Sequence, residues 1–289
     1  MKILPEQIMN ILGKPSPPPR VWEQQFDGDQ AELESLVSRD WKEIKLGDLY
    51  IYFLDLMYVE LQPDLFRYLF PICLYRWYES LMENKQDTLE ESYIYECLEK
   101  FHFGMGNGYL LQSMTSPDER EAIYAFFHDA LIERIEAERG FSNTGYPVRD
   151  YKWIFRLYDI CVFAPVIDRI WTTWWILNSP GKAVSAIIYA SSLVYLEGEN
   201  QIFDPIFGYS YGEPYTISAG TGGCWLIENS QFMEKTLNVE YIQTKLIEAA
   251  ERLSTEPEGD IAFQVAEDAL KLERDEIIAF RLGAVIATH

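Results

Sequence analysis

The chain has 289 residues and a mass of 33.7 kDa, and 48% of its residues are hydrophobic and 15% aromatic, which excludes disorder over most of its length. Lysine and arginine number 24 against 46 aspartates and glutamates, giving a formal net charge of −22. This charge disfavours binding to nucleic acids and to anionic membranes, and it favours encounter with a basic protein. The alternative is that the excess acid only keeps the protein soluble.

The cysteines and the apolar runs bear on where the protein is found. Cys73, Cys97, Cys161 and Cys224 form no C-x-x-C pair, which argues against a zinc knuckle and a disulfide framework. The first residues lack the apolar stretch of a signal peptide, and the uncharged run 183–196 is shorter than the ~18–20 residues of a membrane-spanning helix. The sequence therefore predicts a cytoplasmic protein with reduced thiols and no cofactor.

In chain order, residues 1–20 are predicted to form a short amphipathic N-terminal segment and a proline linker, because the proline run 15–19 cannot be helical. Residues 21–289 are predicted to fold as a single compact unit, with two packed halves meeting near residue 145 as an alternative. Apolar residues at helical spacing predict helices over 29–44, 49–61 and 63–81, with a kink or restart of the last at Pro71.

Helix starts are marked most clearly where serine precedes proline. Ser116-Pro117 and Ser179-Pro180 each place an N-cap residue before a proline suited to the first helical position. The first of these helices is expected to stop at Gly140, and Pro165 is expected to break the aromatic-rich run 150–175. Further helices are predicted over 236–253, 260–273 and 275–286.

Residues 201–232 differ from the rest of the chain. They combine glycines and aromatic residues with an alternating pattern and no helical period, which predicts a small sheet or a pair of hairpins. The predicted fold is therefore mainly α with a small β element (α+β), the β region lying near 201–232.

Motifs that resemble catalytic sites lack their usual context. Residues 208–212 match the G-x-S-x-G of serine hydrolases around Ser210, but no helical pattern follows them, and the only later histidine is His289. The companions of a Ser-x-x-Lys enzyme are missing around Ser179 and Lys182. We predict no catalytic residue, no metal site and no enzymatic activity. An enzyme whose carboxylate or serine site is assembled only in three dimensions is the first alternative.

Features suited to binding a protein are more numerous than features of catalysis. Acidic clusters lie before and within the predicted helix 29–44 and again before residue 261, and tyrosines recur in the glycine-rich region. Carboxylates would speed the encounter with a basic partner, and tyrosines suit the centre of an interface. The candidate partner-binding residues are Asp27, Asp29, Glu32, Glu34, Tyr209, Tyr211, Tyr215, Glu256, Glu258 and Asp260.

Residues 41–79 resemble an uncharacterised bacterial family in which a tryptophan precedes an apolar helix and a Phe-Arg-Tyr-x-x-Pro step, here residues 66–71. In character, though not in aligned residues, the whole chain is similar to immunity proteins of type VI secretion and contact-dependent toxins. This resemblance implies that the chain binds and neutralises a basic toxin effector, with a nuclease as the expected type. A scaffold or assembly subunit is the second alternative, and self-association is left open.

Overall fold

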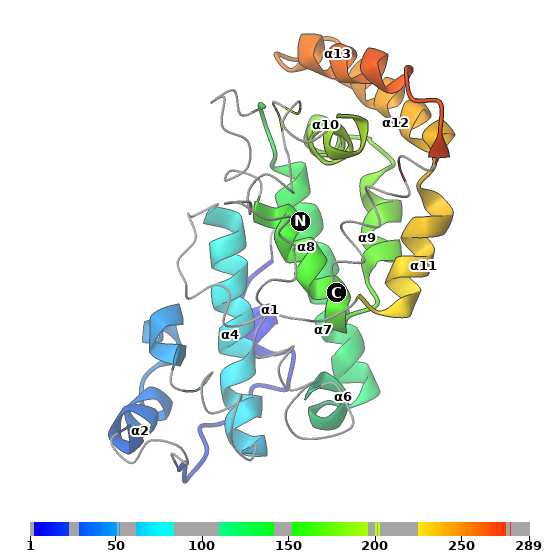
Figure 1. Cartoon of the computed structure of the whole chain (residues 1–289). Coiled ribbons are helices and arrows are strands. Elements are labelled where there is room, and N and C mark those ends of the chain that lie inside the picture. The colour runs from blue at the N-terminus through cyan, green and yellow to red at the C-terminus, as the bar shows by residue number, and fades with distance from the viewer. Residues whose placement is uncertain are drawn as a thin grey trace, which may run out of the picture. The chain divides into compact units, whose positions relative to one another are not determined.

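The computed structural model describes residues 3–22, 29–50, 52, 62–83, 110–141, 152–195, 200, 202, 225–275 and 278. Within these ranges the chain is helical and contains no strand (Figure 1). It divides into two compact units, Met1–Ala130 and Leu131–His289, which are described separately here. The alternative of two halves that meet near residue 145 concerns residues outside the described ranges and stays a prediction.

The small β element predicted near 201–232 is wrong. Helix α11 (Ile227–Thr236) occupies the end of this range, while residues 203–224 lie outside the described ranges. The helix buries Asn229 and Met233, which are one helical turn apart. The side-chain amide of Asn229 donates to the carbonyl oxygens of Cys161 and Ala164 at 2.7 and 2.8 Å, so tertiary hydrogen bonds hold this segment as a helix.

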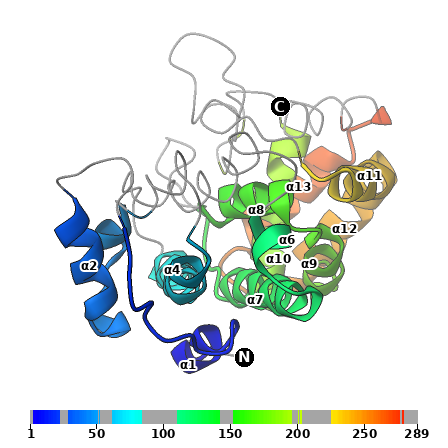
Figure 2. The same cartoon turned by 90° about the horizontal axis from the view of Figure 1, so that it is seen from below.

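In unit 1, α4 (Pro63–Glu83) is the central element, and most of its side chains are buried. The helix does not restart at Pro71, because burial on several faces outweighs the ~3 kcal/mol that an interior proline costs. Figure 2 looks along α4 and shows α1 (Pro5–Met9) beside it. Ile8 and Leu12, which are 1% and 2% exposed, anchor this N-terminal segment in the unit.

The remaining elements of unit 1 are short, apart from α7. They are α2 (Gln30–Ser38), two 3₁₀ turns η1 (Trp41–Glu43) and η2 (Leu46–Leu49), α6 (Leu110–Met114) and the greater part of α7 (Pro117–Glu136). The predicted start of α7 is confirmed, because Ser116 Oγ accepts from the Glu119 backbone N–H at 3.3 Å. Glu119 accepts in return from the Ser116 N–H at 2.8 Å, which completes a capping box.

Unit 2 is built around α10 (Pro180–Val194), which is buried along almost its whole length. The predicted break of the aromatic run is confirmed, since α8 (Lys152–Phe163) ends before Pro165 and α9 (Ile167–Trp174) begins after it. The ring of Trp174 contacts those of Trp153 and Trp171 at centroid distances of 5.3 and 5.5 Å, and the three form the aromatic centre of this unit.

The last described helices of unit 2 are α12 (Val239–Arg252) and α13 (Gly259–Ala269). They lie side by side as a helical hairpin, and both contact α10 (Figure 1). The hairpin includes the predicted acidic cluster of Glu256, Glu258 and Asp260, so its surface is a candidate binding site.

Candidate partner-binding surface on the hairpin of helices α12 and α13

The inner side of the hairpin is lined by small side chains. Ala249 and Ala250 of α12 and Ala262, Ala266 and Ala269 of α13 are 0–4% exposed. Because alanine side chains are short, the two helices can approach closely, and Leu246 and Val265 fill the space that remains. The apolar period predicted for α12 is confirmed, since its buried residues follow a helical repeat.

Polar contacts fix the ends of the hairpin. Asn238 Oδ1 accepts from the Tyr241 backbone N–H at 2.8 Å and caps α12. Gln243 Nε2 donates to the carbonyl oxygens of Ala269 and Leu272, each at 3.1 Å, and so ties α12 to the end of α13. These contacts hold the outer surface in one arrangement.

The basic residues of the hairpin are already used within the fold. Lys245 pairs with Glu248 at 2.6 Å, Lys271 pairs with Asp268, and Arg252 donates to the carbonyl oxygen of Asn178. The Lys271 ammonium, followed by the hydroxyl of Tyr195, lowers the pKa of Asp268. The cations of residues 239–271 therefore have partners within the described residues.

Five carboxylates of the hairpin have no such partner. Their side chains are exposed and make no hydrogen bond or ion pair with another described residue. They lie on α12, in the connection and on α13, so they cover the outer surface of both helices. They are Glu240, Glu251, Glu256, Asp260 and Glu267. We call this set the hairpin carboxylates.

The structure corrects the predicted role of Glu258. This side chain is buried, and its Oε1 accepts from the backbone N–H of Gly140 at 2.6 Å. The predicted stop of α7 at Gly140 is wrong: α7 already ends at Glu136, and Gly140, with a φ of +71°, lies in the segment that follows it. Glu258 thus accepts from the backbone of the segment after α7 and is not available to a partner, whereas its neighbours Glu256 and Asp260 are exposed.

The other predicted partner-binding residues are only partly described. Glu32 and Glu34 are exposed on α2, on either side of its buried residues, and Asp29 is half-buried before the helix begins. Glu34 accepts from Gln30 Nε2 at 2.7 Å. Asp27, Tyr209, Tyr211 and Tyr215 lie outside the described residues. The α2 acids belong to unit 1 and the hairpin to unit 2, so they are two separate candidate surfaces.

The described residues of the candidate catalytic motifs have structural roles. Ser179 Oγ accepts from the Lys182 backbone N–H at 3.4 Å, which confirms it as a helix cap. The Lys182 ammonium is buried and lies 3.2 Å from Glu136 Oε1. Ser210 lies outside the described residues. Among those described, no group of three or more His, Cys, Asp or Glu residues could hold a metal ion.

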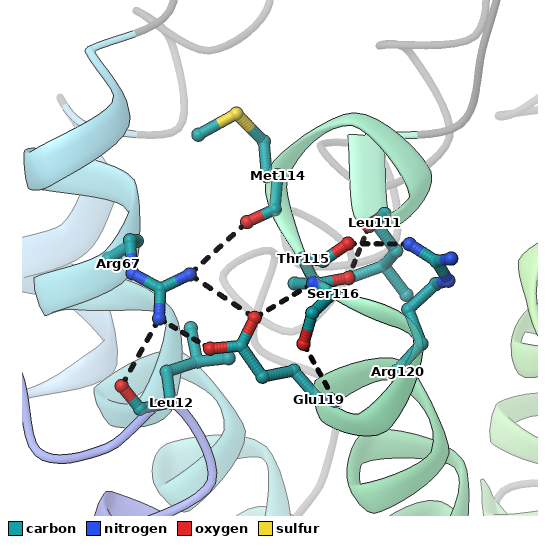
Figure 3. A network of polar contacts seen from close by, with 8 residues as sticks. All are labelled: Leu12, Arg67, Leu111, Met114, Thr115, Ser116, Glu119 and Arg120. Carbon is teal, nitrogen blue, oxygen red and sulfur yellow. Dashed lines mark hydrogen bonds and ion pairs between the residues drawn. The ribbon is translucent and has the colours of Figure 1, made fainter.

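Two further charged groups also serve the fold. In unit 1, the guanidinium of Arg67 pairs with Glu119 and donates to the carbonyl oxygens of Leu12 and Met114, both at 3.4 Å (Figure 3). The hydrogen bonds from Arg67 and then from the Ser116 N–H lower the pKa of Glu119 to about 2. This contact joins α1, α4 and the start of α7.

In unit 2, Arg134 and Glu138 form an ion pair at 3.0 Å with side chains only 7% and 9% exposed. Trp153 Nε1 donates to the same carboxylate at 3.0 Å. Burial raises the pKa of Glu138 in spite of the neighbouring guanidinium. The two buried charges therefore neutralise each other in the interior of the unit.

Comparisons with known protein families, with curated proteins and with solved structures find no match to this chain. The function of the chain is therefore inferred from its own residues. None of the described helices is long and apolar enough to cross a membrane.

Sequence reasoning missed part of the hairpin surface. It selected Glu256 and Asp260 but not Glu240, Glu251 and Glu267. The helical period could have found these three, because they fall between the apolar positions of α12 and α13. Helical spacing allows the pairs of Lys245 with Glu248 and of Lys271 with Asp268, each three residues apart, but it does not show that they form in preference to other pairs.

Proposed function

We propose that this chain binds a basic protein and inhibits it by covering its working surface, as an immunity protein does for a toxin. One observation carries the proposal: the hairpin carboxylates are exposed and form no hydrogen bond or ion pair with another described residue. A net charge of −22 adds a long-range attraction for cationic surfaces. The partner that fits best is a nuclease-type toxin effector, whose nucleic-acid-binding face must be basic.

Inhibition would follow from electrostatic steering and occlusion. Unpaired carboxylates raise the association rate of a cationic partner, and the effect weakens as salt screens the charges beyond about 8 Å at physiological ionic strength. Once docked, the acidic surface would occupy the place of nucleic-acid phosphates on the toxin. A toxin so covered cannot reach its substrate.

The test is capture of the partner from the native host. The tagged full chain is purified at low salt, and proteins that elute with it are identified by mass spectrometry. We expect one basic protein near one-to-one stoichiometry, toxic when expressed alone and harmless when expressed with this chain. Recovery of no basic protein, even when the product of the neighbouring gene is supplied, would refute the proposal.

A pair of variants separates the two acidic surfaces. Glu251→Gln/Glu256→Gln/Asp260→Asn keeps side-chain shape on the hairpin, and Glu32→Gln/Glu34→Gln does the same on α2. The hairpin variant is expected to slow association about tenfold at low salt and to flatten its salt dependence, because charge steers the encounter. The α2 variant is the matched control. If it alone slows association, the partner docks on unit 1 and not on the hairpin.

A further inference from the structure

Two large apolar side chains are exposed on one side of α13, Phe263 within the helix and Leu270 as the residue that ends it. Phe263 is 42% exposed and Leu270 is 55% exposed. Seven residues separate them, which in a helix is two turns, so they lie on the same side about 10 Å apart along the axis. Single exposed apolar residues are common, but an aligned pair on one helix forms a strip that another helix can contact.

The contacts of α13 within unit 2 lie elsewhere on the helix. Its buried residues, Ala262, Val265, Ala266 and Ala269, face α10 and α12. Figure 1 shows both of these helices next to α13. Phe263 and Leu270 therefore lie outside the buried residues by which α13 packs against the described helices of unit 2.

Two of the hairpin carboxylates border the apolar pair. Asp260 lies three residues before Phe263, and Glu267 lies four residues after Phe263 and three before Leu270. These are the spacings at which helix side chains are neighbours. The surface thus combines apolar and anionic groups, and a matching ligand must be apolar and cationic at once. We call Asp260, Phe263, Glu267 and Leu270 the α13 ridge.

We propose that the α13 ridge docks a basic amphipathic helix of the partner protein, which names the contact surface of the proposed function and rests on it. Apolar side chains two turns apart on that helix pack against Phe263 and Leu270, while lysine or arginine beside them pairs with Asp260 and Glu267. This is recognition of an amphipathic helix by spaced apolar anchors, with flanking charges that select the partner.

Charge complementarity excludes the other occupants of such a strip. A second copy of this chain would bring the carboxylates of two ridges together, and like charges in contact are unfavourable. An anionic membrane surface meets the same repulsion. A cationic amphipathic helix makes favourable contacts both with the apolar pair and with the two carboxylates of the ridge.

The probe is a fluorescein-labelled synthetic peptide with leucine at helical spacing and lysine elsewhere, titrated with the full chain and followed by anisotropy. Phe263→Gln/Leu270→Gln removes the apolar pair without a helix-breaking residue. We expect affinity to fall about tenfold at both ~30 and ~300 mM NaCl, because apolar contact is little affected by salt screening. Asp260→Asn/Glu267→Gln should lower affinity mainly at the lower concentration.

The matched controls are one variant and one peptide. Ile227 on α11 is 66% exposed and lies off the hairpin, so Ile227→Gln should leave affinity unchanged. A scrambled peptide of the same composition, without an apolar side, should bind less tightly. The proposal is overturned if the wild-type chain does not bind the peptide, if Phe263→Gln/Leu270→Gln binds as tightly as wild type, or if the scrambled peptide binds equally well.

The outcome is separate from that of the proposed function. If the ridge binds the peptide but the chain captures no toxin, the docking surface is supported and the immunity proposal is refuted. A chain that captures and neutralises a toxin equally well after Phe263→Gln/Leu270→Gln would sustain immunity and place the docking surface elsewhere.

Discussion

Two charged regions of the molecule use their charges in different ways. Around Arg67 in unit 1, the guanidinium pairs with Glu119 and also donates to the carbonyl oxygens of Leu12 and Met114. On the hairpin in unit 2, the cations also have partners, but the hairpin carboxylates form no hydrogen bond or ion pair with another described residue. The first region needs its charges in order to fold. The second carries charge that folding does not use, which is the reason for assigning it to a partner.

The largest loss of stability is expected when the buried ion pair of Arg134 and Glu138 is broken. Glu138→Ala leaves the Arg134 guanidinium buried without its carboxylate and removes the acceptor of Trp153 Nε1. We expect the free energy of unfolding to fall by about 3–5 kcal/mol, the usual cost of breaking a buried ion pair. Urea denaturation followed by far-UV circular dichroism measures the change. The exposed Glu251→Ala is the control, and a loss below about 1 kcal/mol for Glu138→Ala would contradict the structural role of the pair.

An intermediate effect is expected at Glu119, and it should depend on pH. The pKa of this carboxyl is lowered to about 2 in the folded chain, against an ordinary value of 4.5. Its contribution to stability is therefore fully present above about pH 5 and is lost as the pH falls toward 2. We expect Glu119→Gln to cost about 1–2 kcal/mol at pH 7, since the carboxylate is partly exposed.

The measurement is the difference between wild type and Glu119→Gln in urea denaturation at several pH values. The difference should narrow steadily between about pH 5 and pH 3. The changing charge of the other acids affects both proteins alike and cancels in the comparison. A difference that stays constant over this range would mean that Glu119 stabilises the fold without its charge.

The smallest effect is expected where the charges have no partner. Glu251→Gln/Glu256→Gln/Asp260→Asn should change the free energy of unfolding by no more than about 0.5 kcal/mol, with a slight gain in stability from reduced self-repulsion. Urea denaturation at low and high salt measures it. A loss of more than about 1 kcal/mol would show that these carboxylates serve the fold, and the contrast with the Arg67 region would disappear.

Local rules predicted the helix boundaries that depend on neighbouring residues. The capping serines Ser116 and Ser179 and the break at Pro165 each follow from the conformation of a few adjacent residues. These features are confirmed because no distant part of the chain is needed to produce them.

Features that depend on distant residues could not be predicted. The sequence predicts that Glu258 belongs to an acidic surface. It is buried instead, and it accepts a hydrogen bond from the backbone N–H of Gly140, 118 residues earlier in the chain. Asn229 lies in a region predicted as β, and its helix is held by carbonyl oxygens of Cys161 and Ala164. Arg252 donates to the carbonyl oxygen of Asn178, 74 residues earlier, whereas Lys245 and Lys271 pair with acids only three residues away.

The buried alanines of α12 and α13 have a thermodynamic consequence for binding. An alanine side chain has no rotamers to lose, so these helices associate at a small cost in side-chain entropy. Their mutual arrangement is set before any ligand arrives. When a partner binds this hairpin, only the exposed side chains lose conformational entropy. A larger part of the contact energy therefore contributes to affinity.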